Sequence, residues 1–345
     1  KKKLWYESLV RLRADRSRLS VSFNTIYSAL GITKQAFHDY CARHQQKAEM
    51  LGYLENLIMK IRRDHPTLAL RTIHSMVGKI GIGRDQFEEY FLSMGFGIER
   101  RKIYWKTTDS RGVSKFENLV KGTLMNQVDQ VWVSDITYFE LQNRFYYITF
   151  ITDAFSRRIV GHSLSNTLIT ENTSLPALKM ALKCRRYSKE NKPGNLIFHS
   201  DGGGQYYAGI FIEQLRLLGI KSSMAEDVYE NAIAERVNGI IKNNYLVHRS
   251  ITSYVQLKKE LDRSVVLYNS QKPHRSLKNE TPIAYELKMA HVCSATKTEG
   301  DELINGKLKK KGLIWLFQIM IREIDSTHSL IQVQLLRLTS ILTSA

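Results

Sequence analysis

Three acidic side chains, Asp135, Asp201 and Glu235, are the residues of this sequence whose types and placement favour metal-ion chemistry. Asp135 lies inside Val131–Leu141, a segment that alternates apolar and polar residues and is therefore typical of a strand. Aspartate is depleted in strands and costly to bury without a partner. A cap or a salt bridge is the alternative role, and this position alone does not decide between the two.

Asp201 comes directly after the short apolar run Leu196–His199 and before three glycines at 202–204. A carboxylate at the C-terminal end of a buried strand faces a cleft in an α/β sheet. An Asp-Gly turn is the alternative, but such a turn predicts a hairpin, whereas a helical pattern follows here. The position therefore favours a functional carboxylate.

Glu235 stands early in a predicted helix over Ala232–Leu246. Asn238 and Lys242 follow three and seven residues later, so all three side chains share one helix face. A solvated polar stripe is the alternative, and most such stripes are solvated. Beside two other unusually placed acids, Glu235 is a candidate metal ligand, and Asn238 and Lys242 are candidate DNA contacts.

Carboxylate oxygens are the ligands that Mg²⁺ or Mn²⁺ prefers, and a few of them suffice because the ion keeps water and binds substrate phosphate. Two ions about 4 Å apart can activate the attacking oxygen and stabilise the leaving oxygen of a phosphodiester. The three cysteines are far apart, and the sequence contains no G-x-S-x-G or Walker motif. The residues therefore predict a two-metal phosphodiester site rather than a covalent nucleophile.

The elements that must position these acids form an α/β pattern. Three strands precede a regular alternation of helix and strand, which predicts a mixed sheet flanked by helices over residues 130–289. The expected strands are 131–141, 145–152, 159–164, 196–199 and 220–224, and the expected helices are 171–184, 211–218 and 232–246.

The first hundred residues contain a repeat, in which Gly31–Tyr40 aligns with Gly81–Tyr90. Each copy follows an amphipathic helix, and helix, glycine turn and second helix are the order of a helix-turn-helix. Helical hairpins in general share this pattern, but two copies in a basic segment favour DNA binding. We predict all-α DNA-binding segments at residues 1–50 and 51–96, with four exposed DNA contacts: Lys34, Gln35, Arg43 and Arg84.

The net charge of +18 indicates a polyanionic partner, and nucleic acid is the commonest one in cells. Residues 1–125 hold 23 of the 51 Lys and Arg but only 12 of the 33 Asp and Glu. A basic linker is expected over 97–129, where Arg100 and Arg101 are further candidate DNA contacts. Residues 290–345 form a tail of unclear structure. No signal peptide or membrane span is expected. Together with the three widely separated cysteines, this favours the reduced cytosol as the location of the protein.

Several ordered motifs resemble the catalytic blocks of bacterial insertion-sequence transposases with a retroviral-integrase-like core. They are Trp132–Tyr138, His199–Tyr206, Glu230–Asn238 and the closing block Tyr268–Pro282. The resemblance implies a ribonuclease-H-like fold and a divalent-metal site held by Asp135, Asp201 and Glu235. It also implies cleavage and strand transfer at the ends of a DNA element, with double-stranded DNA as partner, a homo-oligomer on that DNA, and the bacterial cytosol or nucleoid as location.

Two other interpretations are open at this stage. A decayed or domesticated copy would hold DNA through its helix-turn-helix segments without cutting, and an unrelated ribonuclease-H-like nuclease would cut without transposing. The nuclease gives no reason for two helix-turn-helix units. Asp153 is the nearest rival carboxylate, and we predict that it bonds turn amides or Arg157 instead of a metal.

Overall fold

The structure is a computed structural model that describes residues 2–14, 21–78, 80–98, 116–225 and 231–298. The chain divides into two compact units, Lys1–Glu286 and Leu287–Ala345, and the features below belong to the first. Arg100, Arg101 and residues 299–345 of the expected tail lie outside the described residues. No helix of the described ranges is long and apolar enough to cross a membrane.

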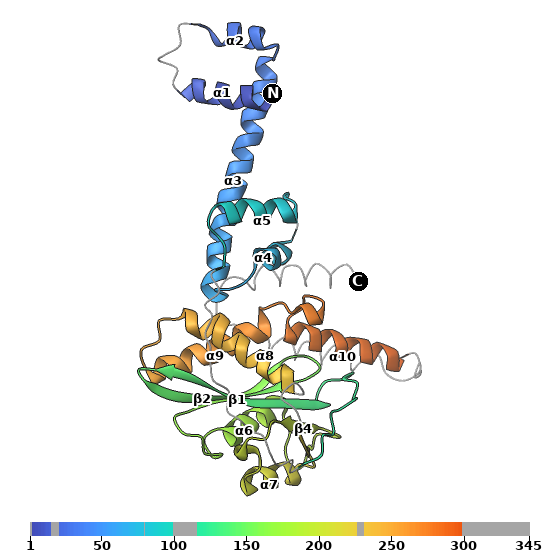
Figure 1. Ribbon diagram of the computed structural model, residues 1–345. Coiled ribbons are helices and arrows are strands. Elements are labelled where there is room, and N and C mark those ends of the chain that lie inside the picture. The colour runs from blue at the N-terminus through green and yellow to red at the C-terminus, as the bar shows by residue number, and fades with distance from the viewer. Residues whose placement is uncertain (1, 15–20, 79, 99–115, 226–230, 299–345) are drawn as a thin grey trace. The chain divides into compact units, whose positions relative to one another are not determined.

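The N-terminal part is all-α, as expected (Figure 1). Its second and third helices meet at Gly31, whose φ of 63° is left-handed, and Thr33 then caps the next helix by accepting a hydrogen bond from the Ala36 amide. Phe37 is fully buried and fixes that helix to its neighbours. The helices are α1 (Lys2–Ala14), α2 (Phe23–Leu30), α3 (Lys34–Asp64), α4 (Leu70–Val77) and α5 (Arg84–Ser93).

The helix α3 is continuous over 31 residues, so the expected boundary at residue 50 falls inside it. Buried side chains at Leu51, Leu54, Ile58 and Ile61 repeat at three and four residues, which keeps one apolar stripe along the helix. This stripe packs against α4 and α5 through residues that include Phe87. α3 is thus the second helix of the first copy of the repeat and also packs against both helices of the second copy.

The part of the chain that follows residue 130 contains a five-stranded mixed sheet in the order β3-β2-β1-β4-β5. β1, β2 and β3 are antiparallel neighbours, whereas β4 runs parallel to β1 and to β5. This order confirms the expected ribonuclease-H-like fold. The strands are β1 (Val131–Leu141), β2 (Arg144–Asp153), β3 (Ile159–Ser165), β4 (Ile197–Ser200) and β5 (Lys221–Met224).

Helices cover both faces of the sheet (Figure 1). Trp132, Ile151 and Val160 point to the face covered by α6 (Ser174–Arg185) and α7 (Gly209–Leu217). On the opposite face, residues that include Phe150 pack against α8 (Ala232–Ile240) and α9 (Tyr254–Ser270). The two apolar layers hold β1 at the centre of the sheet. The last described helix is α10 (Pro282–Thr298).

Two local features differ from the sequence expectation. The β1–β2 turn is formed by Gln142 and Asn143, both with positive φ, because the right-handed twist of a two-residue hairpin favours that conformation. β2 therefore begins at Arg144, one residue before the expected strand 145–152. The helix expected over 232–246 ends as an α-helix at Ile240 and continues as a π-helical turn, η4 (Ile241–Tyr245), and a 3₁₀ turn, η5 (Leu246–His248).

The position of α6 against the sheet depends on Gly161 in β3. A β-carbon added there would lie 2.2 Å from the carbonyl oxygen of Ala177 and 2.9 Å from the Ala181 amide nitrogen, so the helix backbone would have to move. We expect Gly161→Ala to lower the free energy of unfolding by about 1–3 kcal/mol in urea denaturation.

Gly209→Ala is the matched control, because nothing lies within 4 Å of a β-carbon at the start of α7. This variant is expected to unfold at the urea concentration of the wild-type chain or slightly above it. A Gly161→Ala chain as stable as the Gly209→Ala chain would contradict the close approach of α6 to β3.

Candidate active site

Asp135 and Asp201 lie at equivalent places on two neighbouring parallel strands. The register of β1 with β4 pairs Ser134 with Ser200, so the next residue of each chain segment is an aspartate. Both carboxylates are half-buried. The strand pairing therefore brings together two acids that are 66 positions apart in the sequence.

The glycines after Asp201 give its carboxylate a close amide. The Gly203 N–H donates to Asp201 Oδ1 at 3.2 Å, and a β-carbon at Gly203 would lie 3.1 Å from the same oxygen. The Tyr207 hydroxyl donates to the Asp201 carbonyl at 3.2 Å. The loop thus holds Asp201 where a larger residue at 203 would crowd it.

The helix α8 contacts β1 through two asparagines. Asn231 Nδ2 donates to the Ser134 carbonyl at 3.0 Å, and Asn238 Nδ2 donates to Asp135 Oδ2 at 2.7 Å. Glu235 lies between them on the first turn of α8 and is exposed. Sequence analysis assigned Asn231 no role, although an asparagine directly before a helix is a common signal for its start.

Lys242 lies one further turn along, in the π-helical turn. Its ammonium donates to Thr137 Oγ1 at 3.0 Å and to the Tyr138 carbonyl at 3.1 Å, and it lies 5.0 Å from the centre of the Tyr138 ring. Asn238 and Lys242 are 5% and 7% exposed. Asn238 and Lys242 therefore face β1, whereas Glu235 is exposed, and direct contact of these two residues with DNA stays a prediction.

Behind the aspartates lies a buried hydroxyl pair that sequence analysis also missed. Ser134 Oγ donates to the Phe150 carbonyl at 2.8 Å and lies 2.8 Å from the Tyr206 hydroxyl. Tyr206 is fully enclosed, and burial followed by the charges of Asp201 and Asp135 raises its pKa far above the ordinary value. The Tyr206 hydroxyl therefore stays neutral, and its contact with Ser134 fixes the strand residue that precedes Asp135.

The surroundings of Asp135 and Asp201 disfavour the negatively charged form of both side chains. Burial, followed by the charge of Asp201 and then that of Glu235, raises the pKa of Asp135 to about 7, although the Ile136 amide and Asn238 act in the opposite direction. Burial also raises the pKa of Asp201. Like charges in a poorly solvated place favour protonation unless a cation is present. An all-oxygen set with this repulsion fits a hard divalent ion.

The described residues do not form a complete metal cage. No group of three Asp, Glu, His or Cys side chains among them has the arrangement needed to hold an ion. Asp135 and Asp201 are adjacent, whereas Glu235 is exposed on α8 and reaches Asp135 only through its charge. The structure thus brings two of the three expected ligands together and places the third on the neighbouring helix.

Asp153 has the structural role that the sequence predicts. It is fully buried at the end of β2 and accepts hydrogen bonds from the amides of Asp129, Phe155 and Ser156. The nearest guanidinium that pairs with it is that of Arg185, at 3.8 Å, rather than that of Arg157. Both of its oxygens accept hydrogen bonds from these amides, so the prediction of a structural role remains the better interpretation.

Family models described as an integrase core domain match residues 125–227 and 219–282. The chain is 28% identical over 247 residues to the transposase for insertion sequence element IS629 of Shigella sonnei, which covers 68% of this chain and 81% of that protein. It is 27% identical over 223 residues to a putative transposase for IS986/IS6110 of Mycobacterium tuberculosis, covering 62% and 80%. These matches place an integrase core domain in this chain and make the chain similar to insertion-sequence transposases.

A solved structure, the HTLV-2 integrase catalytic core domain in complex with magnesium, covers 46% of this chain and 97% of its own, at 20% identity and a TM-score of 0.38. The matched family region, residues 125–282 taken together, contains all three acids. It does not reach the N-terminal repeat, Gly31–Tyr40 and Gly81–Tyr90.

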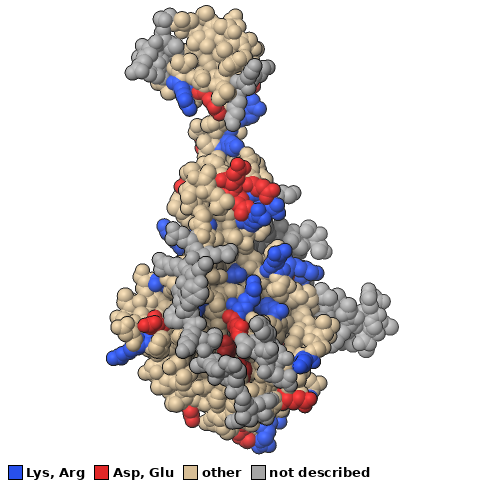
Figure 2. Space-filling view, in the orientation of Figure 1, with Lys and Arg blue, Asp and Glu red and all other residues tan. Residues whose placement is uncertain are grey.

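The four DNA contacts expected in the N-terminal repeat lie on exposed helix surfaces. Lys34 begins α3 and Arg84 begins α5, where exposed Arg84 pairs with exposed Asp85 at 2.9 Å. Gln35 donates to Asp39 Oδ1 at 2.7 Å, and Arg43 donates to the Asp39 carbonyl at 3.2 Å. Exposed pairs of this kind are weak and exchange readily for phosphate. Basic and acidic side chains are interspersed over the face shown in Figure 2.

Proposed function

We propose that this chain is a DNA transposase that cleaves one strand at the end of its element and joins the freed end to target DNA. The adjacency of Asp135 and Asp201 on parallel strands, with Glu235 on the helix beside them, carries the proposal. A phosphodiester gains negative charge during in-line attack. Three carboxylates would repel that charge, so bound cations are needed to stabilise it. Integrase-core relatives support the same class of reaction.

Asp135, Asp201 and Glu235 would hold two Mg²⁺ or Mn²⁺ ions, which supply activation of the attacking oxygen and stabilisation of the leaving oxygen. Asn238 orients Asp135 through the 2.7 Å hydrogen bond, and Gly203 orients Asp201. In the first step the oxygen of water forms a bond to phosphorus while the bond to a 3′ oxygen breaks, which leaves a 3′-hydroxyl. In the second step the oxygen of that 3′-hydroxyl forms a bond to a phosphorus of the target strand while the target's bond from that phosphorus to its 3′ oxygen breaks, which leaves a new 3′-hydroxyl on the target.

The N-terminal helices would bind the element ends as double-stranded DNA. Lys34, Arg43 and Arg84 are proposed to contact phosphates or base edges, and Gln35 a base edge. All four are exposed; Lys34, Gln35 and Arg84 stand at the start of a second helix of the repeat, and Arg43 lies further along α3. Joining two ends requires two active sites, so a homo-oligomer on DNA is part of the proposal. No observation favours a copy that only binds DNA.

The cutting activity is tested with duplex DNA that contains the sequences flanking this gene, incubated with Mg²⁺. We expect Asp201→Asn to reduce strand cleavage and joining by at least about 10²-fold, because an amide neither carries the charge nor binds a hard cation as strongly. Products are resolved on denaturing gels.

Asp262→Asn is the matched control, because Asp262 is an exposed acid of the same core, 53% accessible, that pairs with His162. This variant should cut and join at the wild-type rate. An Asp201→Asn chain that joined strands normally would show that the catalytic assignment is wrong.

DNA binding by the N-terminal helices is tested separately, by measuring how binding to the same duplex depends on salt in the absence of metal. Lys34→Ala combined with Arg84→Ala should weaken binding and flatten its slope against log salt by about 1–2, because fewer counterions are released. Asp201→Asn should bind as well as the wild-type chain or slightly better, since it removes a charge that repels phosphate.

Lys179→Ala combined with Lys183→Ala removes the same charge from exposed positions of α6 and should leave the slope unchanged. If both double variants changed the slope equally, the repeated helices would have no special place in DNA binding.

A further inference from the structure

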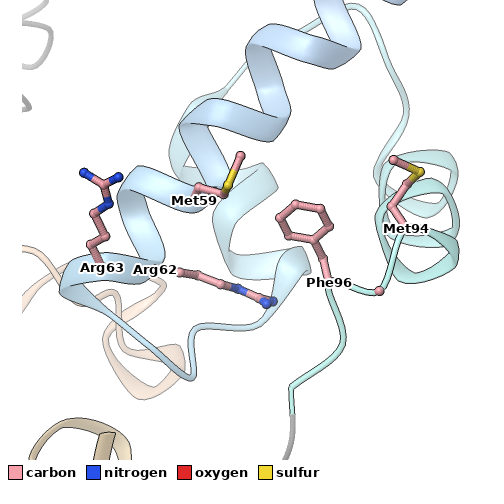
Figure 3. Close-up of a pocket in the computed structure, with 6 residues that line it drawn as sticks. Met59, Arg62, Arg63, Met94 and Phe96 are labelled. Atoms are coloured by element: carbon pink, nitrogen blue, oxygen red, sulfur yellow. The ribbon is translucent and has the colours of Figure 1, made fainter. Parts of the chain in front are cut away.

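A cavity of about 510 Å³ lies between the C-terminal half of α3 and the segment that follows α5 (Figure 3). It is separate in sequence from both the acid site and the starts of the repeated helices. Its volume lies within the range of roughly 300–1,000 Å³ that is usual for small-molecule sites. The lining residues are Met59, Arg62, Arg63, Met94, Gly95 and Phe96.

One wall of the cavity is a fixed aromatic ring. Gly95 has a left-handed φ of 83°, its N–H donates to the Leu92 carbonyl at 3.0 Å, and the Phe96 N–H donates to the Phe91 carbonyl at 2.9 Å. These two bonds form a Schellman ending of α5, which turns Phe96 back onto the helix. Its ring packs edge-on against buried Phe91, with centroids 5.6 Å apart, and remains partly exposed.

The second feature is an arginine without partners. Within the described part of the chain, Nε and Nη2 of Arg62 are buried and have no hydrogen-bond acceptor. Figure 3 shows this guanidinium extending from α3 toward Phe96, whereas the guanidinium of Arg63 points away. Two buried donors without an acceptor are costly, and a turn of the side chain toward the cavity would offer them as a fork to two oxygens of one phosphate.

The remaining wall is apolar but adaptable. Met59 and Met94 are 43% and 51% exposed, and their flexible thioethers suit a flat ring placed against Phe96. A site that combines a fixed aromatic face, two thioethers and a forked cation has the components that bind an unpaired base together with its phosphate. Bases within a duplex offer no free face, so a paired nucleotide does not fit.

We propose that this cavity binds one unpaired nucleotide of DNA, with the phosphate on Arg62 and the base against Phe96. The proposal rests on the proposed function in one respect, because it takes DNA as the polyanion that this chain binds. The cavity would then hold a displaced or overhanging nucleotide next to the duplex that the repeated helices grip.

The test measures anisotropy of fluorescein-labelled duplexes bound by the full chain without metal. One duplex has a short single-stranded thymidine extension, and the other has an abasic extension with the same number of phosphates. We expect the wild-type chain to bind the thymidine form about tenfold more tightly, because stacking adds affinity that phosphates alone do not. Equal affinity for the two would overturn the proposal.

Three variants separate the parts of the site. Phe96→Leu keeps the apolar packing on Phe91 but has no aromatic face, so the thymidine preference should disappear. Arg62→Ala should weaken binding of both extended duplexes and lower the salt slope by about 0.7. Lys60→Ala removes an exposed charge of the same helix and should retain the full preference. A Phe96→Leu chain that kept the preference would also overturn the proposal.

Asp201→Asn distinguishes this site from the catalytic one. It should retain the thymidine preference while losing strand joining. A wild-type chain that preferred the thymidine extension but never cut DNA would contradict the proposed function and support the nucleotide site. A wild-type chain that cut DNA without this preference would support the proposed function and contradict the nucleotide site.

Discussion

The repulsion between two carboxylates on adjacent parallel strands is the constraint around which the core is built. Asp135 and Asp201 follow the paired residues Ser134 and Ser200, and burial together with their mutual charge raises the pKa of Asp135 to about 7. Such an arrangement destabilises the chain unless a cation is bound. The two helical layers, the amide of Gly203 and the Asn238 side chain hold it in place.

The pattern of the sheet could be predicted from the sequence because alternation and turn residues specify strands locally. β1 was placed with its observed bounds, and the other strands differ by only one residue or a few at their ends. The start of β2 differs by one residue because the sequence pattern does not show that Gln142 and Asn143 are the pair that adopts positive φ. The continuity of α3 was missed because each copy of the repeat was considered separately.

The roles of the polar residues on α8 could not be derived from spacing. Asn238 and Lys242 share a face with Glu235, but helical periodicity does not tell whether that face meets solvent, DNA or a strand. In the structure both are buried against β1, where Asn238 binds Asp135 and Lys242 binds Thr137. Only the tertiary position of α8 decides this.

The most direct test of the central constraint is the melting temperature of the full chain, wild type and Asp201→Asn, with and without Mg²⁺. Without metal, removing one charge should raise the melting temperature by roughly 2–4 °C for each kcal/mol of relieved repulsion. Mg²⁺ should raise the melting temperature of the wild-type chain and have little effect on the variant. A variant that melts lower without metal, or that Mg²⁺ stabilises as much as it stabilises the wild type, would contradict the account.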